Sequence, residues 1–93
     1  MTADDLEIRR RAIRIRAWRR GMREMDILLG GFAEAKLAEL DAHDIGDFER
    51  LLEVQDQQAF SWLCGTEKPP AEHDTPLLAK ILEFHRHAKP VNV

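Results

Sequence analysis

The sequence predicts an all-α protein, a single compact domain folded as a five-helix bundle. Apolar residues recur every three to four positions in five separate segments, which is the period of a half-buried helix. No window alternates polar and apolar residues for long enough to indicate a strand. With 93 residues the chain has room for one thin core, and a helical bundle covers such a core with local contacts. We therefore treat residues 1–93 as one domain.

The first predicted helix covers about residues 4–18, and acidic side chains near its start suit the positive end of the helix dipole. Two apolar stripes lie on nearly opposite sides of this helix, one with Ile8, Ala12 and Ile15 and the other with Leu6, Ile13 and Ala17. Two interpretations are open. In the first, the helix packs one stripe on the bundle and offers the other stripe to a partner. In the second, it is a peripheral helix with scattered alanines and isoleucines.

Glycines mark the end of the first helix and a break in the second. Gly21 permits the positive φ at which helices commonly end. A second helix then runs to about Leu40, interrupted by Gly30 and Gly31. Each of these two glycines costs about 1 kcal/mol relative to alanine inside a helix. The pair therefore predicts a kink, a close crossing of two helices or a flexible point.

Aspartates are the expected N-caps of the third and fourth helices, because their carboxylates accept hydrogen bonds from the first free N–H groups. Asp44 is expected to begin the third helix, and Asp56 to cap a short fourth helix over residues 57–64. Gly65 then ends the fourth helix. Residues 66–74 are expected to form an exposed loop.

The fifth helix begins at a cap followed by a first-turn proline, Thr75 and Pro76. Pro90 is expected to stop this helix, because proline cannot donate the next backbone hydrogen bond. Beyond it, residues 89–93 are expected to fray.

Charge is unevenly distributed along the chain. Residues 1–25 carry eight arginines and four acids, whereas residues 26–93 carry six basic residues and thirteen acids. A basic front on an acidic body favours an oriented encounter with a charged partner. Two alternatives stay open: arginine is a good helix former on a solvated face, and a basic face also suits a small nucleic-acid-binding module. The acidic body and the lack of a helix-turn-helix or zinc pattern disfavour the nucleic-acid alternative.

Cysteine and histidine usage points away from disulfides and metals. A single cysteine, Cys64, rules out an internal disulfide and fits a reducing compartment, and we expect it to be buried as a small apolar residue. His85 and His87 are two positions apart, about 200° around a helix, so no metal site is expected. Early acids and interrupted apolar runs favour a cytoplasmic protein with no signal peptide and no membrane partner.

The most informative segment is the corner between the first two helices, where the chain reads Arg19-Arg20-Gly21-Met22-Arg23-Glu24-Met25-Asp26. It contains the string R-G-x-x-E after an arginine-rich helix. Further matching residues follow in order: Phe32, Arg50-Leu51-Leu52-Glu53, Asp56, Phe60, Trp62 and Lys68-Pro69. This ordered set resembles the assembly factors that promote covalent FAD attachment to the flavoprotein subunit of succinate dehydrogenase.

The resemblance covers nearly the whole chain and implies a compact five-helix fold. It implies binding to the flavoprotein subunit of succinate dehydrogenase, and in bacteria also to that of fumarate reductase. It further implies an assembly factor or chaperone that aids formation of the histidyl–FAD bond and is not itself an enzyme. No glycine-rich loop precedes a helix, so the chain is expected to hold no FAD and no cofactor of its own. We expect the free chain to be a monomer.

From the resemblance we predict a partner-binding site at the corner, with Arg20 and Glu24 docked near the flavin. Gly21 would allow close approach. The neighbouring members of the predicted site are Trp18, Arg19, Met22 and Asp26. Structural alternatives stay open for each: an Arg20–Glu24 pair at i and i+4 could only stabilise the corner, and Gly21 could only be a helix C-cap. No catalytic residue is predicted.

Overall fold

The computed structural model of the chain describes residues 3–87. Five α-helices and two short 3₁₀ helices make up this part: α1 (Ala3–Ala17), α2 (Arg23–Lys36), η1 (Leu37–Glu39), α3 (Ala42–Leu51), α4 (Asp56–Cys64), η2 (Ala71–His73) and α5 (Pro76–His87). Residues 3–87 contain no strand, and the predicted all-α, five-helix fold is confirmed. Pro90 and the tail expected to fray at 89–93 lie outside the described residues.

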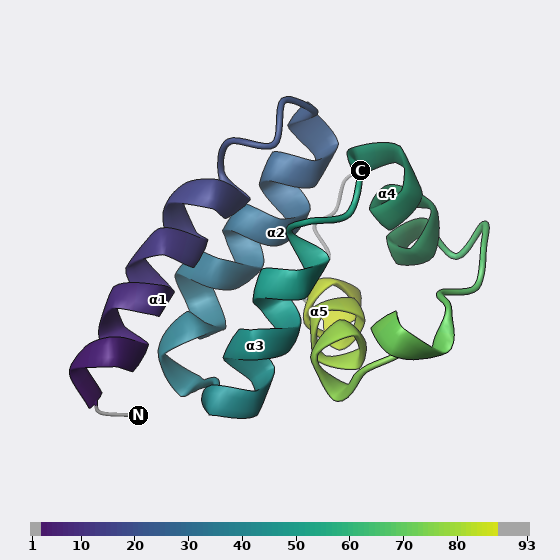
Figure 1. The fold of residues 1–93 in the computed structure, drawn as a ribbon. Coiled ribbons are helices and arrows are strands. Elements are labelled where there is room, and N and C mark those ends of the chain that lie inside the picture. The colour runs from purple at the N-terminus through teal and green to yellow at the C-terminus, as the bar shows by residue number, and fades with distance from the viewer. Residues whose placement is uncertain (1–2, 88–93) are drawn as a thin grey trace.

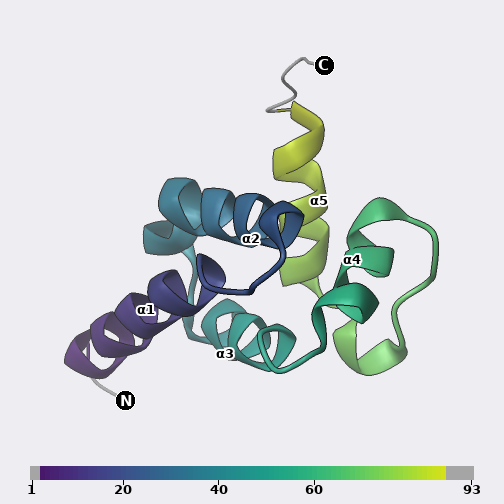
Figure 2. The same cartoon turned by 90° about the horizontal axis from the view of Figure 1, so that it is seen from above.

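Helices α1, α2 and α3 pack together, and α5 packs across α2 and α3 (Figure 1). The view from above shows α5 along its length, whereas Figure 1 shows it nearly end-on (Figure 2). In both views α4 and η2 lie on the side of the molecule away from α1. The radius of gyration is 12.7 Å, close to the value of about 12 Å that one domain of this length should have. The chain therefore forms one globule.

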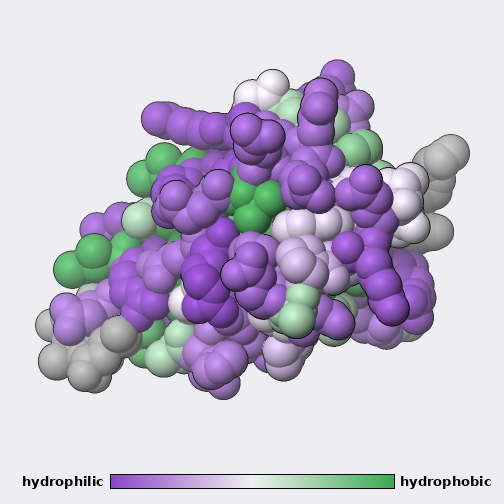
Figure 3. Space-filling model, turned by 45° about the vertical axis from the view of Figure 1, so that its right-hand side comes forward, coloured by the Kyte–Doolittle hydropathy of each residue, from purple (hydrophilic) through white to green (hydrophobic). Residues whose placement is uncertain are grey.

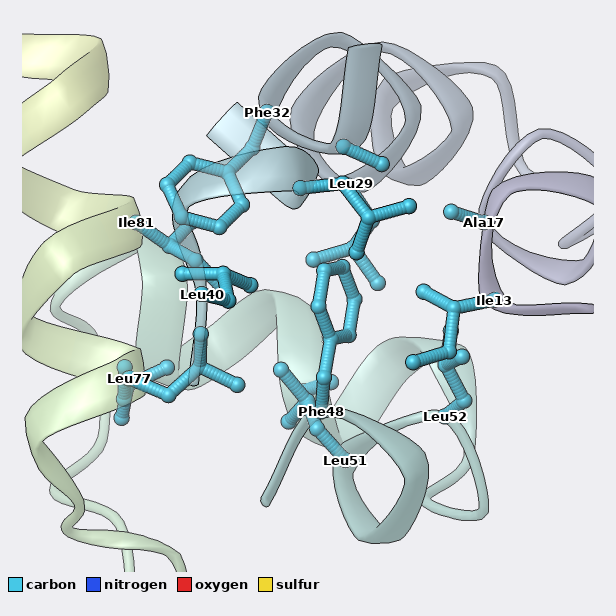
Figure 4. Packing of buried hydrophobic residues seen from close by; sticks show 14 of the residues in the cluster. Ile13, Ala17, Leu29, Phe32, Leu40, Phe48, Leu51, Leu52, Leu77 and Ile81 are labelled. Atoms are coloured by element: carbon cyan, nitrogen blue, oxygen red, sulfur yellow. The ribbon is translucent and has the colours of Figure 1, made fainter. Parts of the chain in front are cut away.

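The core lies where α2, α3 and α5 meet, and its largest side chains are aromatic. Phe32 and Phe48 are fully buried, and their ring centroids lie 6.0 Å apart. Phe84 meets the Phe32 ring edge-on at 5.6 Å. Figure 4 shows Leu29 and Ile81 among the side chains that point into this cluster from α2 and α5. The outer face shown in Figure 3 is largely hydrophilic, with apolar residues in small separate patches.

The packing of α1 decides which of its two stripes faces inward. Ile13 and Ala17 are fully buried, and Leu6 packs against the core from its edge. On the opposite side, Ile8 is 63% exposed and Ile15 is 50% exposed. The first helix therefore uses one stripe for the bundle and leaves the other on the surface.

Two predicted N-caps are wrong by one to three positions. Asp41, not Asp44, caps α3, because its carboxylate accepts a hydrogen bond from the Asp44 N–H at 2.8 Å. Asp44 lies inside the helix, where it is buried and accepts a hydrogen bond from Lys80 Nζ at 2.5 Å. Gln55 is the N-cap of α4, and Asp56 is its first helical residue. Instead of capping their own helices, Asp44 and Asp56 accept hydrogen bonds from basic residues distant in the sequence, Lys80 and Arg20.

The glycine pair leaves α2 continuous from Arg23 to Lys36, and η1 follows. Gly30 is buried against the indole ring of Trp18, and a Cβ there would lie under 3 Å from three ring atoms. The interpretation as a close crossing is therefore confirmed at Gly30. Nothing lies within 4 Å of the position that a Cβ on Gly31 would take, so only one glycine of the pair is required by packing.

Three further predictions about the fourth and fifth helices are confirmed. Gly65 adopts φ +80° at the end of α4. Thr75 caps α5 by accepting a hydrogen bond from the Leu78 N–H at 3.1 Å. The segment 66–74 is largely exposed and contains η2. Cys64, in contrast, is exposed and not buried as predicted, because it is the last residue of α4 and the buried face of that helix is made by Ala59 and Trp62.

Candidate functional site

The corner between α1 and α2 is closed by backbone geometry and one carboxylate. Gly21 has φ +90°, so the expected positive φ is confirmed. The Asp26 Oδ1 accepts a hydrogen bond from the Arg20 backbone N–H at 2.8 Å. The Asp26 N–H in turn donates to the Met22 carbonyl at 3.0 Å, within the first turn of α2. Asp26 therefore holds the two sides of the corner together and is not merely a solvated acid.

The Arg20 side chain points into the molecule. Its Nε donates to Asp56 Oδ1 at 2.8 Å, and the side chain is only 11% exposed. Its two terminal nitrogens donate to backbone carbonyls, Nη1 to Leu52 at 2.5 Å and Nη2 to Val54 at 2.6 Å. Arg20 forms no ion pair with Glu24 among the described residues. The guanidinium is thus occupied by the segment that joins α3 to α4.

Trp18 covers the place where α1 and α2 cross. Its indole ring lies over Gly30, its Nε1 donates to Glu34 Oε2 at 3.2 Å, and 42% of the residue remains exposed. Met22, on the other side of the corner, is half-buried and packs against the core. Trp18 thus contributes both to packing and to the surface, whereas Met22 contributes mainly to packing.

Three charged side chains point outward at the corner: Arg19, Arg23 and Glu24 are exposed and form no hydrogen bond or ion pair with any described residue. Ile27, one turn after Glu24, is 51% exposed. We call the exposed set Trp18, Arg19, Arg23, Glu24 and Ile27 the corner surface. The prediction from sequence included neither Arg23 nor Ile27. An isoleucine outside the apolar face of α2 was the signal that could have found Ile27.

Many of the N-terminal arginines are already paired with the chain's own acceptors. Arg9 forms a two-point ion pair with Glu49, with the shorter bond 2.6 Å long, and this raises the pKa of Arg9 and lowers the pKa of Glu49. Arg16 pairs with Glu53 at 2.9 Å, and Arg10 donates to two backbone carbonyls around η1. The basic front is therefore partly neutralised inside the molecule. This disfavours a nucleic-acid interface, which needs unpaired cations along one face.

Other features of the described residues lie away from the corner. A groove of about 810 Å³ between α2, η1 and α5 contains no residue of the predicted site. His85 Nε2 lies 2.7 Å from the Leu28 carbonyl oxygen. Within residues 3–87 no group of three histidine, cysteine or acidic side chains is placed to hold a metal ion. No helix in that range is long and apolar enough to cross a membrane.

Comparison with known proteins decides the family. The sequence profile of a family described as the flavinator of succinate dehydrogenase matches residues 11–85, which include the corner and all helices except the first turns of α1 and the end of α5. The chain belongs to this family. The match extends well beyond the R-G-x-x-E string, so the family assignment does not depend on the short motif alone.

Individual relatives agree with the profile. The chain is 41% identical, over 89% of its own length and 76% of the relative's, to a protein of Acetobacter pasteurianus named FAD assembly factor SdhE. It is 31% and 33% identical to proteins named succinate dehydrogenase assembly factor 2, mitochondrial, from Dictyostelium discoideum and Cryptococcus neoformans var. neoformans. The chain spans 57% and 49% of these two relatives, about half of their length.

Proposed function

We propose that this chain is an assembly factor that binds the flavoprotein subunit of succinate dehydrogenase and promotes covalent attachment of FAD to it. The observation that carries the proposal is the family match over residues 11–85, with a relative named FAD assembly factor at 41% identity. The corner adds a physical basis, because it presents unpaired charges of both signs beside exposed apolar side chains. Such a mixture suits a protein–protein contact.

We propose the corner surface as the contact with the flavoprotein. Arg19, Arg23 and Glu24 supply charges that are free to pair with a partner. Gly21 leaves the tip of the corner open, since nothing lies within 4 Å of where its Cβ would be, and a partner backbone can approach closely there. Trp18 supplies apolar contact area of the kind that is enriched in interface hot spots. Of the other predicted site residues, Arg20, Met22 and Asp26 are partly buried and support the corner from within.

The proposed role is positioning and not catalysis by this chain. Binding would hold the flavoprotein in the geometry that favours the flavin bond, which lowers the entropic part of the barrier. The FAD belongs to the partner, and no cofactor of this chain is proposed. We place this action in the cytoplasm of the cell, where the exposed thiol of Cys64 stays reduced, and we propose that the free chain is a monomer.

Co-expression of the succinate dehydrogenase flavoprotein subunit with and without this chain tests the proposal. Covalent flavin is measured as in-gel fluorescence after denaturation. We expect the covalent flavin to rise several-fold when the chain is present. Equal covalent flavin in both cultures would overturn the function.

Two further arms of the same experiment test whether fumarate reductase is a second client and whether the chain binds nucleic acid. The flavoprotein subunit of fumarate reductase replaces that of succinate dehydrogenase in the first arm, and increased covalent flavin there would show a second client. A random DNA duplex titrated at low and high salt forms the second arm. We expect no binding to DNA, and salt-sensitive DNA binding without binding to either flavoprotein would favour the nucleic-acid alternative.

A further inference from the structure

Arg20 is the least exposed of the arginines in residues 9–23. Arg9 and Arg16 each pair with one glutamate, through side chains that are 26% and 42% exposed. Arg20 is 11% exposed, and all three of its donor nitrogens have acceptors within 2.8 Å. Those acceptors all lie between residues 52 and 56. One side chain at the corner therefore organises a whole connector on another part of the chain.

The acceptors explain why an arginine is needed there. The carbonyls of Leu52 and Val54 lie just beyond the last turn of α3, where backbone oxygens have no partner within the helix. Asp56 is the first residue of α4, and its Oδ1 accepts a hydrogen bond from Arg20 Nε. The planar guanidinium offers donors in a fixed fork, which matches three acceptors at set angles, whereas a lysine ammonium is a single compact charge.

The backbone of Arg20 is fixed as well, since its N–H donates to Asp26 on α2. The two sides of the residue thus link α2 to the connector between α3 and α4. Arg19 immediately precedes it in the chain, and Arg23 and Glu24 follow the Gly21 turn. Any shift of Arg20 would therefore move the exposed charges on both sides of it.

We propose that Arg20 and Asp56 are positioning residues. They lock the corner onto the α3–α4 connector so that Arg19, Arg23 and Glu24 meet the partner in one geometry, and the Arg20 guanidinium itself does not touch the flavoprotein. This inference rests on the proposed function for the identity of the partner. It adds Asp56 to the functional residues, although Asp56 is only partly exposed and belongs to another helix.

A double-mutant cycle tests the inference, with affinity for the isolated succinate dehydrogenase flavoprotein subunit as the readout. The variants are Arg20→Ala, Asp56→Ala and the double variant, all measured at a temperature where circular dichroism shows them folded. We expect each single substitution to weaken binding by about tenfold or more, and the double variant to bind no worse than either single one. Asp56→Ala with wild-type affinity would overturn the inference, and so would additive losses.

Arg20→Lys distinguishes a guanidinium that positions the corner from one that contacts the partner directly. It keeps the charge, but its three donors all sit on one nitrogen and do not match acceptors that three separate guanidinium nitrogens reach, so we expect it to bind as weakly as Arg20→Ala. Restored affinity in Arg20→Lys would mean that the charge meets the partner, which overturns the inference. The matched control is Glu53→Ala, which removes an exposed ion pair between α1 and the same connector and should leave affinity within about twofold.

A spectroscopic readout in the free chain is independent of the partner. The Arg20 Nε–H resonance should exchange slowly with water in the wild type and in Glu53→Ala, and rapidly in Asp56→Ala. Should Asp56→Ala not fold, Asp56→Asn keeps the size and one acceptor but loses the charge, so its weaker hydrogen bond should still give lower affinity and faster exchange than the wild type. Fast exchange in the wild type would overturn the inference. Wild-type chain that fails to bind the flavoprotein would instead overturn the proposed function.

Discussion

The corner and the core of this protein are held together by different forces. The core is apolar and consists of side chains such as Phe32, Phe48 and Ile81 that lie at or below 1% exposure. The corner contains few apolar contacts of its own and depends on directed hydrogen bonds from Arg20 and to Asp26. Apolar packing is tolerant of residue identity as long as volume is kept, whereas a hydrogen-bonded corner depends on particular atoms. A family can therefore vary its core and still keep the geometry of its corner.

The difference also separates stability from function. Substitutions in the core should change the free energy of unfolding and affect the partner only through loss of folded protein. Substitutions of the three charged residues of the corner surface should change the partner interaction and leave stability nearly unchanged. The following predictions start with the largest expected change in stability and end with the smallest.

Phe48→Ala is expected to have the largest effect, a loss of about 3–5 kcal/mol in the free energy of unfolding. The ring is fully buried against Phe32, so its removal leaves a cavity in the middle of the bundle. Domains of this size are stable by about 5–15 kcal/mol, so the substitution should remove a large part of the free energy of unfolding. Chemical denaturation followed by circular dichroism measures the loss. Leu82→Ala, at a residue that is 37% exposed, is the control and should cost under about 1 kcal/mol.

The two neighbouring glycines of α2 should respond in opposite directions. Gly30→Ala forces the Trp18 indole away, and we expect a loss of about 1–2 kcal/mol. The added methyl group of Gly31→Ala lies in open space within a helix, so the free energy of unfolding should rise by up to about 1 kcal/mol. Thermal unfolding measures both, and the Trp18 indole N–H resonance should shift only in Gly30→Ala. Equal stability of the two variants would contradict the close crossing.

Gly21→Ala tests backbone strain at the tip of the corner. At φ +90° a Cβ is disfavoured, and we expect a loss of about 1–2 kcal/mol. The space around Gly21 is open, so strain and not collision is the cause, and Gly21→Asn should lose less because asparagine tolerates a positive φ better. Denaturation midpoints of the two variants give the comparison. Wild-type stability of Gly21→Ala would show that the corner relaxes freely.

A smaller change in stability is expected from the pH dependence contributed by Glu49. Its pKa lies below the ordinary 4.5 because Arg9 donates hydrogen bonds to the carboxylate. The folded state therefore holds the charged form more tightly than the unfolded state. This stabilisation is complete above pH 4.5 and is lost as the pH falls from there through the lower folded pKa. The pair is partly exposed, so Glu49→Gln should cost under about 1 kcal/mol at neutral pH and nothing measurable well below the folded pKa.

Denaturation of Glu49→Gln and wild type across this pH range checks the sign. The difference in stability should shrink as the solution becomes more acidic. Glu72→Gln, at an exposed residue outside the ion pair, should show no such trend. A difference that grows toward acid would contradict the assigned direction of the pKa shift.

Helical periodicity was sufficient to predict the fold but not every cap. The five segments and the core positions follow from spacing, because a half-buried helix must repeat its apolar residues about every 3.6 positions. The predicted cap of α3 was wrong because several acids occur within one turn there. Asp41 and Asp44 are equally good caps by residue type, and the choice depends on Lys80, which reaches Asp44 from α5. Local sequence does not contain that contact.

The candidate site was predictable in position but not in the direction of its side chains. The corner itself followed from Gly21 and the motif around it. The inward turn of Arg20 could not be predicted, because two of its three acceptors are backbone carbonyls that any residue would supply. The exposure of Arg23 likewise depends on how α2 is rotated against the core, whereas Ile27 lies outside the apolar face of α2 and could have been predicted.

Glu24→Ala provides the most direct test of the central claim, that the corner surface acts on the flavoprotein. Glu24 is exposed, and its side chain forms no hydrogen bond or ion pair with a described residue, so its removal should change stability by no more than about 0.5 kcal/mol. The measurement is covalent flavin on the co-expressed succinate dehydrogenase flavoprotein subunit, with Glu72→Ala as the surface control. We expect covalent flavin at the level seen without the chain for Glu24→Ala, and at the wild-type level for the control. Wild-type covalent flavin with Glu24→Ala would contradict it.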